Sequence, residues 1–139
     1  MNEQGMNQFL ETLRQAFIVI MRQIDLDKSQ LVKNSNFLWR DNAVQISMED
    51  YAIYVDSGRR VGTMPPVRAI SQWIRTSGIS IPIGMKAEQF AFAIARSIQK
   101  KGIKARPFLD RLSKEVTQLT FEYMNHKVQE ELLMMFKDK

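Results

Sequence analysis

The chain has 139 residues, of which 45% are hydrophobic, and it carries a net charge of +5 with a pI near 9.6. It contains no cysteine, which excludes a disulfide framework, a thiol nucleophile and a cysteine-based metal site. This length and composition predict a single domain over residues 1–139 that is large enough to bury its own core.

Charge and hydropathy limit the partners to be expected. A positive net charge favours polyanions, because contacts with phosphates release counterions. Acidic residues are interspersed through most of the chain, so no dedicated nucleic-acid arm is predicted. The longest apolar run, residues 16–21, is far shorter than the roughly 20 residues that span a bilayer. The first residues, MNEQGMNQFLE, have no basic stretch ahead of an apolar one, unlike a signal peptide. We expect a soluble protein with no membrane association.

Residues 6–26 are predicted to form an amphipathic helix. Apolar side chains recur at helical spacing along one face, at Phe9, Leu13, Phe17, Ile20 and Ile24. Ile18 and Val19 lie outside this stripe, which indicates a second contact for the helix, such as one with another subunit.

A small β unit is predicted over residues 37–55. Segments 37–39 and 43–48 form two strands, and Asp41 and Asn42 between them tolerate the left-handed backbone of a tight hairpin. In the second strand apolar and polar side chains alternate, so one face should be buried and the other wet.

The segments on either side of this hairpin are less regular. Residues 25–36 are polar, which predicts a loop with a short turn at Leu31 and Val32. Residues 51–55 carry aromatic and β-branched side chains that suit an extended segment, although a short helical turn fits them as well.

Residues 51–74 change character twice. Their apolar pattern breaks at a loop that contains two glycines, and two prolines then fix the backbone ahead of a helix over residues 67–76, which Gly78 ends. The loop carries Arg59 and Arg60 between two apolar anchors. Its simplest interpretation is a solvated connection.

Two further helices are predicted towards the C-terminus. Residues 86–101 place small and apolar side chains on one face and stop at Gly102, and a last helix over residues 107–136 opens at Pro107. Residues 79–84 are apolar but contain a proline, so they form a packed loop or at most an edge strand. A helix of nearly thirty residues is long for such a domain, so we expect its end to leave the core or to bend.

This order of elements predicts an α+β fold. A small antiparallel β-sheet packs against amphipathic helices, with long helices at the N-terminal and C-terminal ends. The chain contains no internal repeat and no low-complexity segment.

Motifs that carry catalytic chemistry are absent from the sequence. It has no phosphate-binding glycine-rich loop, zinc-protease motif or serine nucleophile elbow, and its one histidine, His126, falls in a long helical pattern. The remaining enzyme hypothesis is a paired-carboxylate hydrolase that uses Glu49 with Asp50 or Asp56. Solvent exposure or ion pairs with nearby arginines explain these acids equally well. We therefore expect no catalytic, metal or cofactor site.

Two surfaces are candidates for contact with a partner. Basic side chains cluster about the turn after residues 86–101, at Arg96, Lys100, Lys101, Lys104, Arg106 and Arg111. They either face solvent, where cations at a helix C-terminus favour the dipole, or contact phosphates or an acidic partner. The end of the last helix is rich in adaptable apolar side chains, at Leu132, Leu133, Met134, Met135 and Phe136. These side chains could complete the core, but the length of the helix favours a contact between subunits.

Three segments occur in an order that is found in a known family. They are YAIYVDSG at residues 51–58, PPVRAISQWI at residues 65–74 and GIKARPFL at residues 102–109. This order resembles the neck and tail-completion proteins of tailed bacteriophages, minor virion proteins that join the head to the tail. In that family a Y-A-x-x-V-[ED]-x-G segment follows a small β unit, and an R-P-F-[LI] step opens the final helix. The resemblance covers roughly residues 31–112. Arg59 stands where the family more often has threonine, and the final helix is longer here.

The resemblance implies a structural, ring-forming protein of the virion neck. The ring would be sixfold, assembled in the bacterial host cytoplasm, and placed between the portal-connector and the tail tube. Arg59 and Arg60 become candidates for a loop that faces a neighbouring subunit or the DNA channel. Five residues become structural anchors, namely Tyr51, Gly58, Trp73, Pro107 and Phe108. Contacts with DNA in the channel would be weak and independent of sequence. The resemblance does not distinguish among four positions in the neck, namely connector, stopper, tail-completion protein and tail terminator.

Charge alone supports a second hypothesis. The high pI and the basic cluster at residues 96–111 predict a small DNA-binding protein that contacts backbone phosphates without sequence preference. No aromatic residues are interleaved with these cations, so base-specific recognition is not expected.

Overall fold

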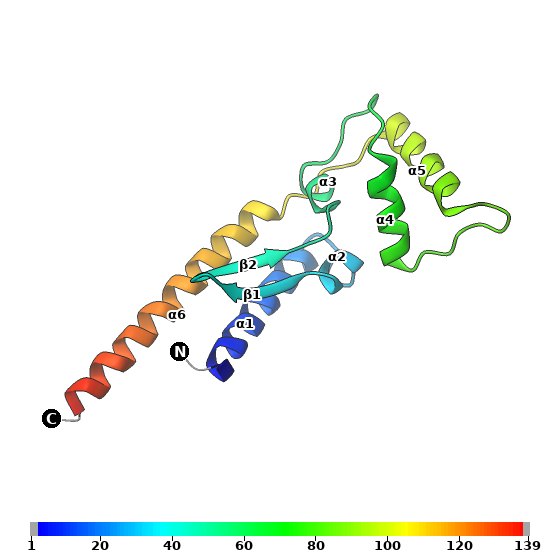
Figure 1. The fold of residues 1–139 in the computed structure, drawn as a ribbon. Helices are drawn as coiled ribbons and strands as arrows, with labels where there is room; N and C mark the ends of the chain where they lie inside the picture. Colours follow the sequence, from blue (N-terminus) through cyan, green and yellow to red (C-terminus); the bar gives the residue numbers. More distant parts are fainter. Residues whose placement is uncertain (1–2, 138–139) are drawn as a thin grey trace.

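The computed structural model describes residues 3–137, and these form an α+β fold (Figure 1). The elements in chain order are α1 (Glu3–Arg22), α2 (Gln30–Lys33), β1 (Asn36–Arg40), β2 (Ala43–Ser47), α3 (Ala52–Ser57), α4 (Val67–Ser77), α5 (Ala87–Lys101) and α6 (Leu109–Lys137). The predicted fold class is confirmed, with a small antiparallel sheet and long helices at both ends of the chain.

The apolar stripe of α1 forms the centre of the main core. Its buried residues are Phe9, Leu13, Phe17, Ile20 and Met21, nearly the set that the periodicity predicts. The helix ends at Arg22, four residues earlier than predicted, because Asp25 adopts a left-handed backbone (φ 59°) and the Leu26 amide turns back to the Met21 carbonyl. Ile24 still packs partly against the core from this turn.

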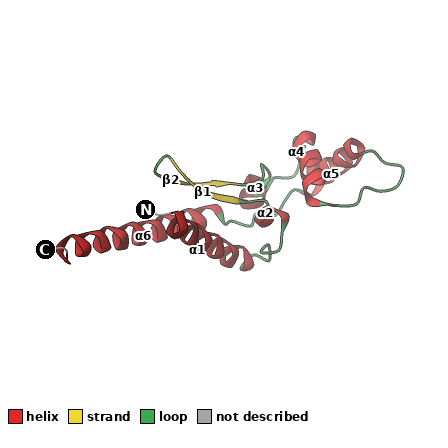
Figure 2. Cartoon of the chain, turned by 60° about the horizontal axis from the view of Figure 1, so that its bottom comes forward, coloured by secondary structure: helices red, strands yellow, loops and turns green. Residues whose placement is uncertain are grey.

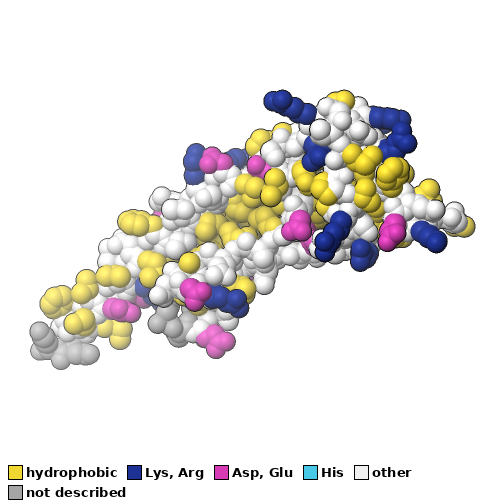
Figure 3. Space-filling model, turned by 45° about the horizontal axis from the view of Figure 1, so that its top comes forward, with side chains coloured by type: hydrophobic (Ala, Val, Ile, Leu, Met, Phe, Trp, Pro, Cys, Tyr) yellow, Lys and Arg dark blue, Asp and Glu magenta, His cyan; other side chains and the backbone are white. Residues whose placement is uncertain are grey.

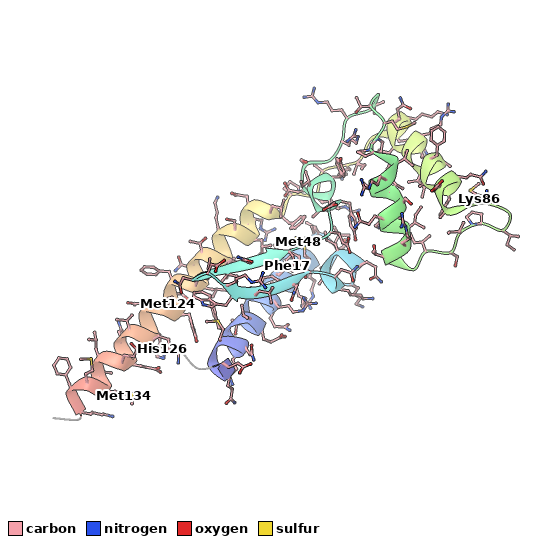
Figure 4. The ribbon with its side chains drawn as sticks, in the orientation of Figure 1. Phe17, Met48, Lys86, Met124, His126 and Met134 are labelled. Atoms are coloured by element: carbon pink, nitrogen blue, oxygen red, sulfur yellow. The ribbon has the colours of Figure 1, made fainter. Side chains whose placement is uncertain are left out.

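The β-hairpin covers one side of this core. Its two strands pair from Asn36 opposite Ser47 to Arg40 opposite Ala43. Two consecutive turn residues, Asp41 and Asn42, have φ values of 55° and 58°. Positive φ at both central positions matches the twist of a two-residue hairpin, so the predicted turn is confirmed. Figure 4 shows Phe17 of α1 lying beneath the hairpin, where its ring centroid is 5.9 Å from that of Phe37.

Of the two conformations left open for residues 51–55, the structure shows the helical one, so the predicted β unit over residues 37–55 is too long at its C-terminal end. The β unit ends at Ser47, and the chain forms the short helix α3 instead. This helix buries Ala52 and packs Val55 against the main core, while Ile53 points to solvent with 63% of its surface exposed. Residues three apart share a face of a helix but not of a strand, so burial overrides the β propensity of these side chains.

Helices α4 and α5 form a hairpin with a separate small core. Two side chains from each helix are buried there, Ile70 and Ile74 with Ala91 and Ala95. The alanines allow close approach of the two helices, and Gly78 ends α4 in the left-handed conformation as predicted.

The loop between α4 and α5 is not packed as expected. Ile79 and Ile81 are each 38% exposed, and Ile83 is fully exposed. Because α4 and α5 already bury their apolar faces against each other, no other described element covers this loop, which projects away from the rest of the chain (Figure 1).

The first half of α6 packs on α1, and the second half does not. Leu112 is buried, and Tyr123 stacks on Phe9 with ring centroids 4.2 Å apart. Every residue from Val128 to Lys137 is exposed, and Figure 2 shows this end of α6 projecting past α1. The expectation that the helix end leaves the core is confirmed. The structure places the α4–α5 hairpin and the C-terminal end of α6 at opposite ends of an elongated molecule (Figures 1 and 2).

Candidate functional site

Two segments that are far apart in sequence cross between the main core and the α4–α5 hairpin. One leaves α3 and the other leaves α5, and Arg59 and Ile103 form an isolated antiparallel bridge where they meet. Four backbone hydrogen bonds join the segments, from Arg59 N to Ile103 O and Ile103 N to Arg59 O (both 2.9 Å), from Gly62 N to Gln99 O (2.7 Å) and from Arg106 N to Val55 O (2.8 Å). The four bonds show an approximate local twofold symmetry. Val55, Arg59 and Gly62 on the first segment correspond to Gln99, Ile103 and Arg106 on the second, each 44 residues later in the chain.

The crossing requires glycine on both segments. Gly58 and Gly102 have φ values of 70° and 71° with extended ψ, a combination that is essentially restricted to glycine. A Cβ at Gly58 would lie 2.6 Å from the Ile103 carbonyl oxygen, and one at Gly102 would lie 2.6 Å from the Arg59 carbonyl oxygen. The two backbones could not approach this closely with any other residue at these positions.

Asp56 connects the first segment to the start of α6. Its Oδ1 accepts hydrogen bonds from the backbone amides of Phe108 (2.8 Å) and Leu109 (2.9 Å). These amides have no partner within the helix, so the carboxylate acts as a cap supplied from elsewhere in the chain. Phe108 itself is fully buried, with its ring 6.2 Å from that of Phe17. Residues 51–58 and 102–109 therefore form one structural unit.

The other predicted anchors have unequal roles. Tyr51 and Trp73 meet edge to face at 6.5 Å and link the main core to α4. Burial, together with the nearby charge of Glu49, raises the pKa of Tyr51 to about 12. Pro107 is exposed, and α6 begins two residues after it, so Phe108 anchors this helix start in the core.

Arg59 and Arg60 lie in different environments. The Arg59 guanidinium donates to the Met64 carbonyl oxygen at 2.9 Å and lies 5.2 Å from the centroid of the Tyr54 ring. It therefore holds its own loop in place. Arg60 is exposed, and it is the member of the pair that is free to reach a partner.

The predicted basic cluster lies at the end of α5 and in the segment that follows. Arg96, Lys100, Lys101, Lys104 and Arg106 are all exposed. Arg111 belongs to the first turns of α6, where its guanidinium donates to Gln23 after α1, so it is tied to the main core.

The structure shows a charge separation that the overall composition hides. Residues 58–106, which comprise the crossing loops and the α4–α5 hairpin, hold ten basic residues and one acidic residue, a net charge of +9. The rest of the chain holds ten basic and 14 acidic residues, a net charge of −4. Lys and Arg side chains surround the hairpin end in Figure 3. Within residues 3–137, the ion pairs involve none of the ten cations of the hairpin segment. A count of charges by segment would have found this signal.

The acidic residues of the hydrolase hypothesis have structural roles or face solvent. Asp56 caps α6, Glu49 accepts a hydrogen bond from Asn34 at 3.0 Å, and Asp50 is exposed. Among residues 3–137, no cluster of three or more His, Cys, Asp or Glu side chains is suited to hold a metal ion. None of the described helices is long and apolar enough to cross a membrane.

An apolar groove, which the sequence does not predict, lies between the main core and the α4–α5 hairpin. Its volume is about 520 Å³. Twelve of its fifteen lining residues are apolar or aromatic, namely Leu26, Leu31, Tyr51, Tyr54, Val55, Pro65, Ile70, Trp73, Ile79, Ile94, Ile98 and Ile103. The lining comes from α2, α3, α4, α5 and the crossing segments, so no single stretch of sequence carries the pattern. Figure 3 shows apolar side chains gathered in this region.

A second apolar surface without a partner lies on the end of α6, residues 128–137. Its large side chains are between 48% and 71% exposed, at Val128, Leu132, Leu133, Met134, Met135 and Phe136. Figure 4 shows Met134 near the free end of the helix, far from the Phe17 core.

Comparison of the chain with models of protein families, with curated proteins and with solved structures found no match.

Proposed function

We propose that this protein is a structural virion component of a tailed bacteriophage, a ring-forming subunit that joins the portal-connector to the tail. The observation that carries the proposal is the crossing of residues 51–58 with residues 102–109, where Asp56 caps α6 beside Gly58 and Gly102. These are the segments in which the sequence resembles phage neck and tail-completion proteins. Their joint packing gives a physical reason why both segments would occur together.

The surface properties support a role in assembly. The chain presents a large exposed apolar helix end and an apolar groove, which are features of protein interaction sites. Its unpaired cations gather at one end, where a DNA channel or an acidic neighbour would stabilise them.

Assembly can be tested with the purified full-length protein. Mass measurement and negative-stain images should show closed rings, formed alone or on mixing with portal or tail-tube protein of the same phage. A monomer under all of these conditions would contradict the proposal. Genes for portal, capsid and tail-tube proteins beside its own gene would support it independently.

The loop at Arg60 offers a more local test. Arg60→Glu should weaken ring assembly or DNA retention while leaving the free energy of unfolding unchanged, because the side chain is exposed. Arg59→Glu is unsuitable for this purpose, since it would also release the contacts with Met64 and Tyr54.

The charge separation favours a second candidate function, DNA binding without sequence preference. Five exposed cations on one end of the molecule, at residues 96–106, match the chemistry of backbone phosphates. The isolated protein should then bind duplex DNA of any sequence, with an affinity that falls steeply as salt is raised. Lack of duplex binding at low salt would exclude this candidate and leave the structural role in place.

A further inference from the structure

The exposed apolar stripe on α6 is distinct from the stripe that packs on α1. The core-facing side chains run from Leu109 to Tyr123, whereas Phe121, Met124, Val128, Leu132 and Met135 form the second stripe. At about 100° per residue, this second stripe lies roughly 140° further round the helix. It follows that these side chains do not extend the core. They form a separate surface at helical spacing, which suits insertion of a helix into a groove.

The α6 end cannot reach the apolar groove of its own chain. Ile103 lines that groove, and α6 begins six residues later and runs away from it for 29 residues, about 43 Å at 1.5 Å per residue. The C-terminal end of α6 and the α4–α5 hairpin, which forms one wall of the groove, lie at opposite ends of the molecule (Figure 1). Any helix end that fills the groove comes from another chain.

We infer that the α6 end of one copy docks in the apolar groove of a second copy. Two observations point to this occupant. The groove is lined mostly by apolar side chains, the stripe on α6 is apolar and exposed, and each chain provides one of each. The groove also lies beside the segment of charge +9, whereas residues 128–137 of α6 hold two acidic residues and one basic residue, a net charge of −1, so the helix end and the groove end carry charge of opposite sign.

This contact is heterologous, because different surfaces of the two copies meet. Repetition of such a contact generates a ring when the rotation closes, and an open filament when it does not. The inference therefore rests on the proposed function and names the contact that would build the ring.

The absence of native cysteine allows a direct test by disulfide cross-linking. One full-length variant carries Leu132→Cys on the exposed stripe, and another carries Ile79→Cys at the edge of the groove. Oxidation of the mixture should give a covalent dimer of the two variants. Glu130→Cys, on the opposite face of the same helix, should not give this dimer with Ile79→Cys. Efficient cross-linking of Leu132→Cys with itself would show that the helix ends pair with each other, and would overturn the inference.

A matched pair of substitutions tests whether the contact drives assembly. Leu132→Asp should abolish the association of copies, whereas Leu133→Asp, exposed on another face of α6, should preserve it. Both side chains are exposed in the monomer, so both variants should keep the melting temperature of the wild type at a concentration too low for association. Rings that persist in Leu132→Asp would overturn the docking contact and leave the proposed function standing. Equal loss of assembly in both variants would also overturn it. A wild-type protein that is monomeric even with its phage partners would contradict the docking contact and the proposed function together.

Discussion

Asp56 joins parts of the chain that are more than fifty residues apart. Since its carboxylate accepts from two amides at the start of α6, Asp56→Ala should lower the free energy of unfolding by about 1–2 kcal/mol, as for other helix caps. Urea unfolding measures this change. Asp50→Ala removes an exposed acid nearby and should change stability by no more than about 0.5 kcal/mol. Equal effects of the two substitutions would show that Asp56 contributes no cap.

Gly58 and Gly78 separate two effects of adding a side chain. Both have φ near 70°, but a Cβ at Gly78 meets open space, whereas one at Gly58 meets backbone atoms at 2.6 Å and 2.7 Å. Gly78→Ala should cost about 1–2 kcal/mol from the left-handed backbone alone. Gly58→Ala should cost at least about 1 kcal/mol more, because its ψ of −170° lies in a region essentially restricted to glycine and because the two crossing segments must also separate. Denaturant midpoints of the two variants provide the comparison, and equal midpoints would contradict close packing at the crossing.

Tyr51 predicts how stability changes at alkaline pH. Its pKa is about 12 in the folded protein, above the value near 10 expected in the unfolded chain, so folding favours the neutral phenol. This contribution to stability is complete below pH 10 and is lost as the pH rises towards 12. The free energy of unfolding should therefore decline more steeply between pH 10 and 12 in the wild type than in Tyr51→Phe. Parallel pH curves for the two proteins would contradict this expectation.

At the scale of single elements, α6 combines two different surfaces on one helix. Leu112→Ala removes a buried side chain from the main core and should destabilise the fold by about 2–5 kcal/mol. Leu132→Ala removes an exposed one and should change the stability of the monomer by no more than about 0.5 kcal/mol. Thermal or urea unfolding at a concentration too low for association distinguishes the two. A large effect of Leu132→Ala there would mean that the α6 end packs within its own chain.

The elements also differ in how far local sequence predicts them. Helices α1, α4, α5 and α6 were predicted within a few residues, because their apolar periodicity and their glycine or proline boundaries act locally. Helix α3 was left undecided, since a segment of six residues takes its conformation from what it packs against. The loop after α4 was expected to be packed, because its composition is apolar, but composition alone does not supply a neighbouring element to cover it.

At the scale of the whole molecule, two buried clusters divide the fold. One surrounds α1 and the other lies between α4 and α5, and they meet at the crossing segments. The small cluster has alanine at its centre, so the larger side chain of Ala95→Leu should overpack it and destabilise the α4–α5 hairpin by about 1–3 kcal/mol. Hydrogen exchange of Ala95→Leu should show lost protection in α4 and α5, with little change in α1. Ala93→Leu places the same side chain on the exposed face of α5 and should leave protection unchanged in both clusters. Equal loss of protection in both clusters would show that they unfold as one unit.

Local sequence patterns were enough to predict the fold class, the hairpin turn at Asp41 and Asn42 and the apolar faces of the long helices. Each of these depends on residues that are neighbours in the chain. The sequence also contains both segments of the crossing, residues 51–58 and 102–109, but as separate motifs with no physical link between them.

Only the tertiary structure showed that Asp56 caps α6, that Arg59 holds its own loop and that a groove opens between the two clusters. These features join residues that are distant along the chain or come from several elements, so no local pattern encodes them. The structure likewise showed that the basic α4–α5 hairpin and the exposed apolar end of α6 lie at opposite ends of the molecule, since their separation in space depends on the direction in which α6 leaves the crossing.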